Sequence, residues 1–162
     1  MTAEKALNII AGLCSKKEYC SGDIRGKLLK WELPENDIRK IMEFLQSHKF
    51  IDDARFARIY AEDKFRFNHW GKKKIALMLS QKHISQNVIT EALEAVDPEH
   101  YEESCLEILR QKMKSLQGLD SFQLKVRLMR FGLGRGFDYD TLNQCLSVLL
   151  RENDNQNFRC MG

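Results

Sequence analysis

Apolar residues recur every three or four positions along most of the chain, which is the spacing of one face of an α-helix. The clearest example is the run of Ile38, Ile41, Met42 and Leu45. No segment alternates apolar and polar residues with β-branched enrichment, so we expect no strands. The pattern predicts an all-α chain with nine helices: near 4–14, after Ser21, from Pro34, over 53–68, over 72–82, after Ser85, from Pro98 towards Leu116, after Asp120 or Ser121, and after Asp138.

The apolar pattern repeats about every fifty residues, over two helices and the turn between them. A shift of 51 residues superposes the first unit on the second, with Ile24 on Ile75 and Leu33 on Ile84. A shift of 53 then superposes the second on the third, with Ile75 on Leu128 and Ile84 on Phe137. We predict three tandem three-helix repeats in an elongated body, curved if the units stack with a regular rotation. The predicted boundaries are 1–51, 52–97 and 98–151, followed by a flexible tail at 152–162.

Composition narrows the class of protein. The chain has 162 residues, a formal net charge of +3 and 43% hydrophobic residues, enough to bury a core. No apolar run approaches the ~18 residues that would span a bilayer. The first residues also lack the basic start and apolar centre of a signal peptide. We therefore expect a cytoplasmic protein.

The cysteines and histidines do not form the spacings of a metal site. No Cys-x-x-Cys pair occurs among Cys14, Cys20, Cys105, Cys145 and Cys160, and the four histidines are isolated. In a cytoplasmic protein we expect free thiols that behave as small apolar side chains. We expect no metal and no cofactor.

Basic residues are concentrated on the middle helix of each predicted repeat. From Ser121 to Gly136 there are four basic residues and no acid, and Lys72, Lys73 and Lys74 open the fifth helix. If the repeats stack regularly, these helices form a basic stripe that attracts phosphate backbones or an acidic protein groove. The alternative is that the lysines and arginines are simply the solvated face of amphipathic helices.

Three aromatic residues lie near the junction of the fourth and fifth helices. Phe65, Phe67 and Trp70 can stack on nucleic-acid bases if they are exposed. Aromatic residues at this spacing also commonly belong to a hydrophobic core. The sequence leaves both interpretations open.

Local signals for helix ends accompany the periodicity. Asp52 or Asp53 can cap the fourth helix, and we assign this pair to capping and to the junction between repeats. Gly132 and Gly134 each weaken a helix by about 1 kcal/mol relative to alanine. We therefore expect the eighth helix to end early, which leaves the position of Arg135 open.

The segment Phe-Ile-Asp-Asp-Ala-Arg-Phe-Ala at 50–57 resembles the motif that joins the first and second repeats of the RecX family. That family regulates the bacterial recombinase RecA. Leu33-Pro34-Glu35, the basic segment from Lys72 to Ile84, and the turn at 135–139 resemble other parts of the family pattern. The resemblance covers about 7–150. His83 departs from it, because the family usually has glycine there, so we expect a tighter or less left-handed turn before Ile84.

The resemblance implies a non-enzymatic regulator that binds the groove of the RecA–single-stranded DNA filament. Such a protein limits filament growth, ATP hydrolysis and strand exchange, through many weak contacts and without a deep pocket. We expect a monomer that touches RecA and, in addition, single-stranded DNA, with no membrane contact. The residues predicted to bind the partner or nucleic acid are Lys72, Lys73, Lys74, Arg127 and Arg130, with Arg55 and Arg58 as secondary candidates.

Three other functional classes are alternatives to a filament regulator. Catalysis is disfavoured because the chain has no phosphate-binding glycine loop, no Gly-x-Ser-x-Gly and no His-Glu-x-x-His. A helix–turn–helix reader of duplex DNA is disfavoured because the segment 86–94 has no arginine to recognise guanine. A non-specific single-stranded DNA-binding module and a helical scaffold for some unrelated protein remain as alternatives.

Overall fold

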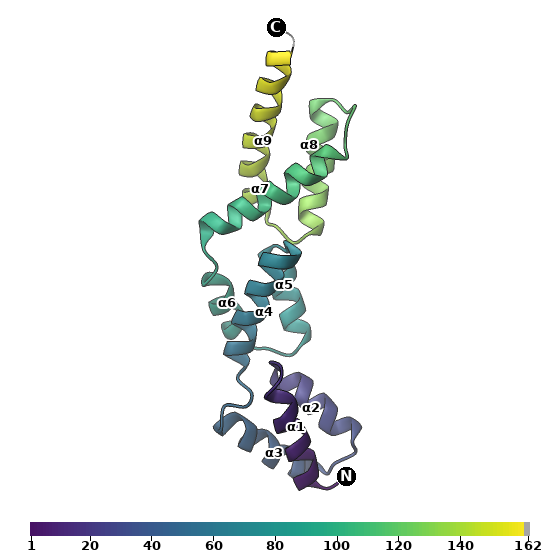
Figure 1. Cartoon of the computed structure of the whole chain (residues 1–162), viewed down its shortest axis with the longest axis vertical. Coiled ribbons are helices and arrows are strands. Elements are labelled where there is room, and N and C mark those ends of the chain that lie inside the picture. Colours follow the sequence, from purple (N-terminus) through teal and green to yellow (C-terminus); the bar gives the residue numbers. More distant parts are fainter. Residues whose placement is uncertain (161–162) are drawn as a thin grey trace. The chain divides into compact units, whose positions relative to one another are not determined.

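The computed structural model describes residues 1–160, and these residues form helices joined by short turns (Figure 1). No strand occurs within this range, so the predicted all-α class is confirmed. The helices lie close to the predicted positions: α1 Ala3–Cys14, α2 Ser21–Lys30, α3 Glu35–Ser47, α4 Asp53–Asn68, α5 Lys72–Gln81, α6 Gln86–Glu94, α7 Pro98–Lys114, α8 Ser121–Gly134 and α9 Tyr139–Cys160. None of the described helices is long and apolar enough to cross a membrane.

The chain divides into two compact units. Unit 1 contains residues 1–60 and 78–93, and unit 2 contains residues 61–77 together with the chain from Glu94 onward. The division passes through α4 and α5, so each of these helices supplies residues to both units.

The core of unit 1 is built on the apolar faces of α1, α2 and α3. The periodic run on α3 is buried as the spacing predicts, with Ile38, Ile41 and Leu45 inside and Met42 packed at the edge. Ile10 on α1 and the α2 pair of Ile24 and Leu28 complete this cluster. Burial of these aliphatic side chains is what holds three short helices together, since helices this short are marginal alone.

The core of unit 2 lies between α7, α8 and α9, each of which packs against the other two (Figure 1). Phe137, in the turn between α8 and α9, is fully buried, and its ring centroid lies 5.2 Å from that of Tyr101 on α7. Each of the three helices contributes buried leucine to this core, for example Leu109 on α7, Leu128 on α8 and Leu146 on α9.

The expectation that α8 ends early is wrong, because α8 runs through Gly132 to Gly134. Gly132 is buried, and a Cβ atom there would overlap the side chain of Leu142 on α9. This glycine allows α8 and α9 to approach closely and does not stop the helix. Arg135 follows directly as the C-cap residue.

Helices α5 and α8 end in the same type of hydrogen-bonded turn. The N–H of Ile84 donates to the carbonyl oxygen of Leu79, and that of Phe137 donates to Gly132 in the same way. The residue before each is left-handed, with φ of 62° at His83 and 92° at Gly136. This is a Schellman cap followed by a buried apolar side chain. The expectation of a less left-handed turn at His83 is therefore wrong, because the cap imposes positive φ without glycine.

The last helix is longer than the sequence predicts. Residues 152–160 belong to α9, although we expected a flexible tail from residue 152. No glycine or proline interrupts this stretch, and Arg110 on α7 forms a 3.2 Å ion pair with Glu152 at its start. The remaining part of the predicted tail, 161–162, lies outside the described residues.

All five cysteines are free. Cys20, Cys105 and Cys145 are buried as small apolar side chains, whereas Cys14 is half-buried and Cys160 is exposed. Burial raises the pKa of the Cys20 thiol to about 11, so this thiol stays protonated at neutral pH.

Candidate partner-binding surface

The first turn of α5 is held by the turn that follows α8. The N–H of Gly71 donates to the carbonyl oxygen of Arg135 at 2.8 Å, and the N–H of Lys73 donates to that of Gly136 at 3.0 Å. The N–H of Lys72 donates to the Tyr101 hydroxyl at 3.2 Å. Because these N–H groups already have partners, this helix start is not an open anion site. Any phosphate or carboxylate bound there would be held by side chains.

Gly71 is required for this arrangement. It is buried, and a Cβ atom at this position would overlap the backbone of Gly136 and Phe137. The glycine directly before the three lysines therefore serves close backbone packing. It holds the lysine run against the turn that follows α8, within unit 2.

The three lysines of α5 have different surroundings. The ammonium group of Lys72 lies 4.9 Å from the ring centroid of Tyr101, and that of Lys74 lies 4.5 Å from that of Trp70. Lys64 on α4 also lies over the Trp70 ring, at 5.0 Å. Of the three, only Lys73 is exposed, whereas Lys72 and Lys74 are half-buried. Each cation–π contact is worth about 0.5–1 kcal/mol at a surface, so a partner must compete for Lys72 and Lys74.

The three aromatic residues considered for base stacking have different roles. Phe65 packs against the core of unit 2, with its ring centroid 5.9 Å from that of Tyr101. Trp70 is half-buried and faces the two lysine ammonium groups. Only Phe67, which is 72% exposed, presents a large free ring area. The core interpretation holds for Phe65, and the stacking interpretation has one exposed candidate.

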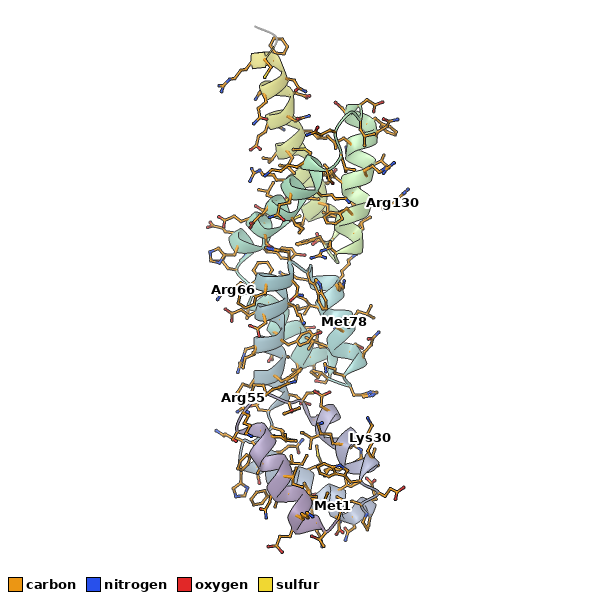
Figure 2. The ribbon with its side chains drawn as sticks, turned by 45° about the vertical axis from the view of Figure 1, so that its right-hand side comes forward. Met1, Lys30, Arg55, Arg66, Met78 and Arg130 are labelled. Carbon is orange, nitrogen blue, oxygen red and sulfur yellow. The ribbon has the colours of Figure 1, made fainter. Side chains whose placement is uncertain are left out.

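Arg127 and Arg130 are exposed on α8, one turn apart, and Figure 2 shows the side chain of Arg130 pointing away from the helix. Neither makes an ion pair within residues 1–160. Their guanidinium groups are therefore available for a bidentate contact with a carboxylate or a phosphate.

Arg55, labelled in Figure 2, makes contacts within unit 1. Its guanidinium group donates to the carbonyl oxygen of Lys49 at 3.2 Å, beyond the end of α3. Its Nε atom lies 2.9 Å from Glu18 Oε1, close enough for an ion pair although not aligned for a hydrogen bond. Arg58 is exposed on the same helix and makes no ion pair in the described part of the chain.

The basic residues directly after α5 and α8 also make contacts within the fold. Lys82 forms a 3.1 Å ion pair with Asp23, and its ammonium group lies 5.6 Å from the Phe56 ring centroid. Burial raises the pKa of Asp23, but hydrogen bonds from Cys20 and Lys82 outweigh it and the pKa is lowered overall. Arg135 donates to the carbonyl oxygen of Asn68.

The adjacent acids Asp52 and Asp53 cap two different helices. Asp52 accepts a 3.0 Å hydrogen bond from the N–H of Arg55 and so caps its own helix, α4. Asp53 accepts from the N–H of Ser21 at 2.7 Å and from its hydroxyl at 2.5 Å, and so caps α2. Sequence reasoning had assigned the pair to capping, but no local signal points to a partner 32 residues away.

The fold and the exposed basic side chains define an all-helical protein built of small helical units. Two family models match the chain: "RecX, second three-helix domain" over residues 52–93 and "RecX, third three-helix domain" over residues 99–146. The chain belongs to the RecX family.

Two known relatives agree with this assignment. The chain is 32% identical over 146 residues to the regulatory protein RecX of Prosthecochloris aestuarii, covering 90% of this chain and 94% of that protein. It is 34% identical over 121 residues to the regulatory protein RecX of Clostridium botulinum, covering 74% of this chain and 56% of that protein. It thus spans little more than half the length of that clostridial relative.

The fold resembles two crystal structures. One is of RecX from Lactobacillus salivarius, with a TM-score of 0.85 and 21% identity over 91% of this chain and 96% of the other. The second is of a regulatory protein RecX, with a TM-score of 0.81 and 21% identity over 88% of this chain and 70% of the other.

Proposed function

We propose that this protein is a modulator, mainly an inhibitor, of the RecA recombinase in the cytoplasm. It binds in the groove of the RecA–single-stranded DNA filament as a monomer, without catalysing a reaction itself. It limits filament growth, ATP hydrolysis and strand exchange during recombination and DNA repair. The observation that carries this proposal is membership of the RecX family, whose relatives are named regulatory proteins.

Exposed basic side chains support contact with such a filament. Lys73 on α5 and the α8 pair of Arg127 and Arg130 are exposed and unpaired in the described residues. DNA phosphates and acidic protein side chains both attract such cations. Several weak contacts on one filament add through effective concentration.

The predicted contact residues differ in the contacts within the fold that each would lose on binding a partner. Lys73, Arg127, Arg130 and Arg58 are exposed and lose no contact described here. Lys72 and Lys74 must leave the faces of aromatic rings. Arg55 must leave Glu18 and the end of α3, so we expect it to contribute least to binding.

The decisive experiment measures ATP hydrolysis by the cognate RecA on single-stranded DNA while the protein is added from substoichiometric amounts. We expect turnover to fall. The triple variant with Lys73, Arg127 and Arg130 changed to glutamate should need at least about tenfold more protein for the same inhibition, because three phosphate or carboxylate contacts are reversed. The triple variant with Lys5, Lys16 and Lys40 changed to glutamate reverses the same number of exposed charges outside this set and is the matched control.

Two results would contradict the proposal. Unchanged ATP turnover together with binding to naked single-stranded DNA would favour the non-specific DNA-binding module. Unchanged turnover with no binding to filament or DNA would favour a scaffold for an unrelated protein.

A further inference from the structure

Helix α8 presents apolar side chains to solvent as well as to the core. Phe122 is 76% exposed, Val126 40% and Leu133 46%. Met129 lies between the last two and is half-buried, because part of its side chain packs against the core of unit 2. Their positions follow the i, i+4, i+7, i+11 spacing of one helix face. We call these four residues the α8 strip. The buried face of the same helix is formed separately by Leu124, Leu128 and Gly132.

Basic residues border the α8 strip on both sides. At about 100° of rotation per residue, Lys125 falls on one side of it, and Arg127 and Arg130 fall on the other. All three are exposed, and none forms an ion pair among residues 1–160. The helix contains no acidic residue. The strip is therefore an apolar surface with a positive rim.

We propose that the α8 strip is the protein-docking surface of this chain, and that its occupant is an acidic, amphipathic segment of the recombinase. This inference rests on the proposed function and says which part of the surface meets protein. The apolar side of the segment covers the strip, and its carboxylates pair with the basic rim. Phe122 is the anchor, because it is the one aromatic side chain of the strip and the most exposed, and buried aromatic side chains carry much of the binding energy in protein contacts.

Chemistry favours protein over nucleic acid as the occupant. Single-stranded nucleic acid binds through base stacking on aromatic rings together with phosphate contacts. Only Phe122 in the strip is aromatic, whereas Val126, Met129 and Leu133 have no flat ring face on which a base can stack. These three side chains gain most when they are covered by other apolar side chains.

Charge also disfavours a second copy of this chain. If two α8 strips paired through a two-fold axis, Lys125, Arg127 and Arg130 of one copy would face the same cations of the other. No acid on α8 could offset that repulsion. An acidic partner removes the problem, since each cation then meets a carboxylate.

The test compares two valine substitutions in unit 2. Val126→Asp places a charge in the strip, and Val148→Asp places the same charge on α9, where Val148 is 43% exposed. The two sites match in residue type, exposure and helical context. Fluorescence anisotropy with labelled protein measures binding to RecA filaments preassembled on single-stranded DNA, and separately to the same DNA without RecA. Circular dichroism and the thermal midpoint show whether each variant is folded.

We expect Val126→Asp to weaken filament binding by about tenfold or more, with Val148→Asp within about twofold of wild type. Binding to naked DNA should be unchanged in both variants. Equal effects of the two substitutions on the filament would overturn the docking proposal alone. So would a matching loss of naked-DNA binding in Val126→Asp, which would assign the strip to nucleic acid. A wild-type protein that neither binds the filament nor slows ATP hydrolysis would overturn the proposed function as well.

Sedimentation velocity of the wild type and of Val126→Asp provides one more check. We expect both to be monomeric. A wild-type dimer that the substitution dissociates would show that the strip pairs with its own copy, and would contradict the proposal.

Discussion

At the scale of single residues, identical side chains close together in the sequence have different structural roles. Asp52 and Asp53 are adjacent, yet one caps α4 and the other caps α2. Arg55 and Arg58 are three positions apart on one helix, yet only Arg55 is enclosed by fold contacts. At this scale, the role follows from which neighbour lies within hydrogen-bonding distance.

Asp53 provides a stability test at this scale. Asp53→Ala should lower the free energy of unfolding by about 1–2 kcal/mol, because α2 loses its cap and Ser21 loses both hydrogen bonds. Urea unfolding followed by circular dichroism measures the change. Asp53→Asn keeps one acceptor oxygen and should lose less. An alanine variant as stable as wild type would show that water replaces the carboxylate at no cost.

At the scale of elements, the close approach of α8 to α9 explains why a glycine interrupts an otherwise apolar helix face. Helix propensity alone makes Gly132 unfavourable, and that argument led to the wrong expectation of an early helix end. Packing makes glycine favourable at this position, since Leu142 occupies the space that a side chain would need.

Alanine substitutions at two helical glycines should change the stability of the protein in opposite directions. Gly132→Ala should destabilise the protein by about 1–3 kcal/mol, because the added methyl group forces Leu142 to move. Gly26→Ala on α2 should stabilise it by up to about 1 kcal/mol, because no atom lies within 4 Å of the added Cβ. Differential scanning calorimetry reads both changes. Stabilisation by Gly132→Ala would contradict the packing explanation.

For the molecule as a whole, we expect stability to decrease in acid, because each unit contains an aspartate with a lowered pKa. Burial raises the pKa of Asp138 in unit 2, but hydrogen bonds from the Thr141 N–H and hydroxyl outweigh it, and the pKa is lowered. Asp23 in unit 1 also has a lowered pKa. A carboxylate with a lowered pKa contributes stability that is fully present above the unfolded-state pKa of about 3.9. That contribution is lost as the pH falls through the folded-state pKa.

The free energy of unfolding should therefore decline as the pH is lowered through and below the ordinary aspartate range. Urea titrations at a series of pH values from 7 to about 3 measure this slope. Asp138→Asn should be less stable at neutral pH and should show a shallower slope in acid, since asparagine does not titrate. The same slope in wild type and variant would mean that Asp138 does not contribute to the acid transition.

The sequence by itself determined the approximate positions of the helices, the equivalence of Ile84 and Phe137, and the family resemblance, because these depend on spacing between neighbours along the chain. The predicted repeat boundaries and the contact residues stay predictions. Tertiary structure alone decided that Asp53 caps a distant helix, that Lys72 and Lys74 lie over aromatic rings, and that Gly132 is a packing site. It also decided which apolar face of α8 packs into the core of unit 2 and which face stays exposed. Each of these depends on what a second element places within a few ångströms, and helical periodicity carries no information about that.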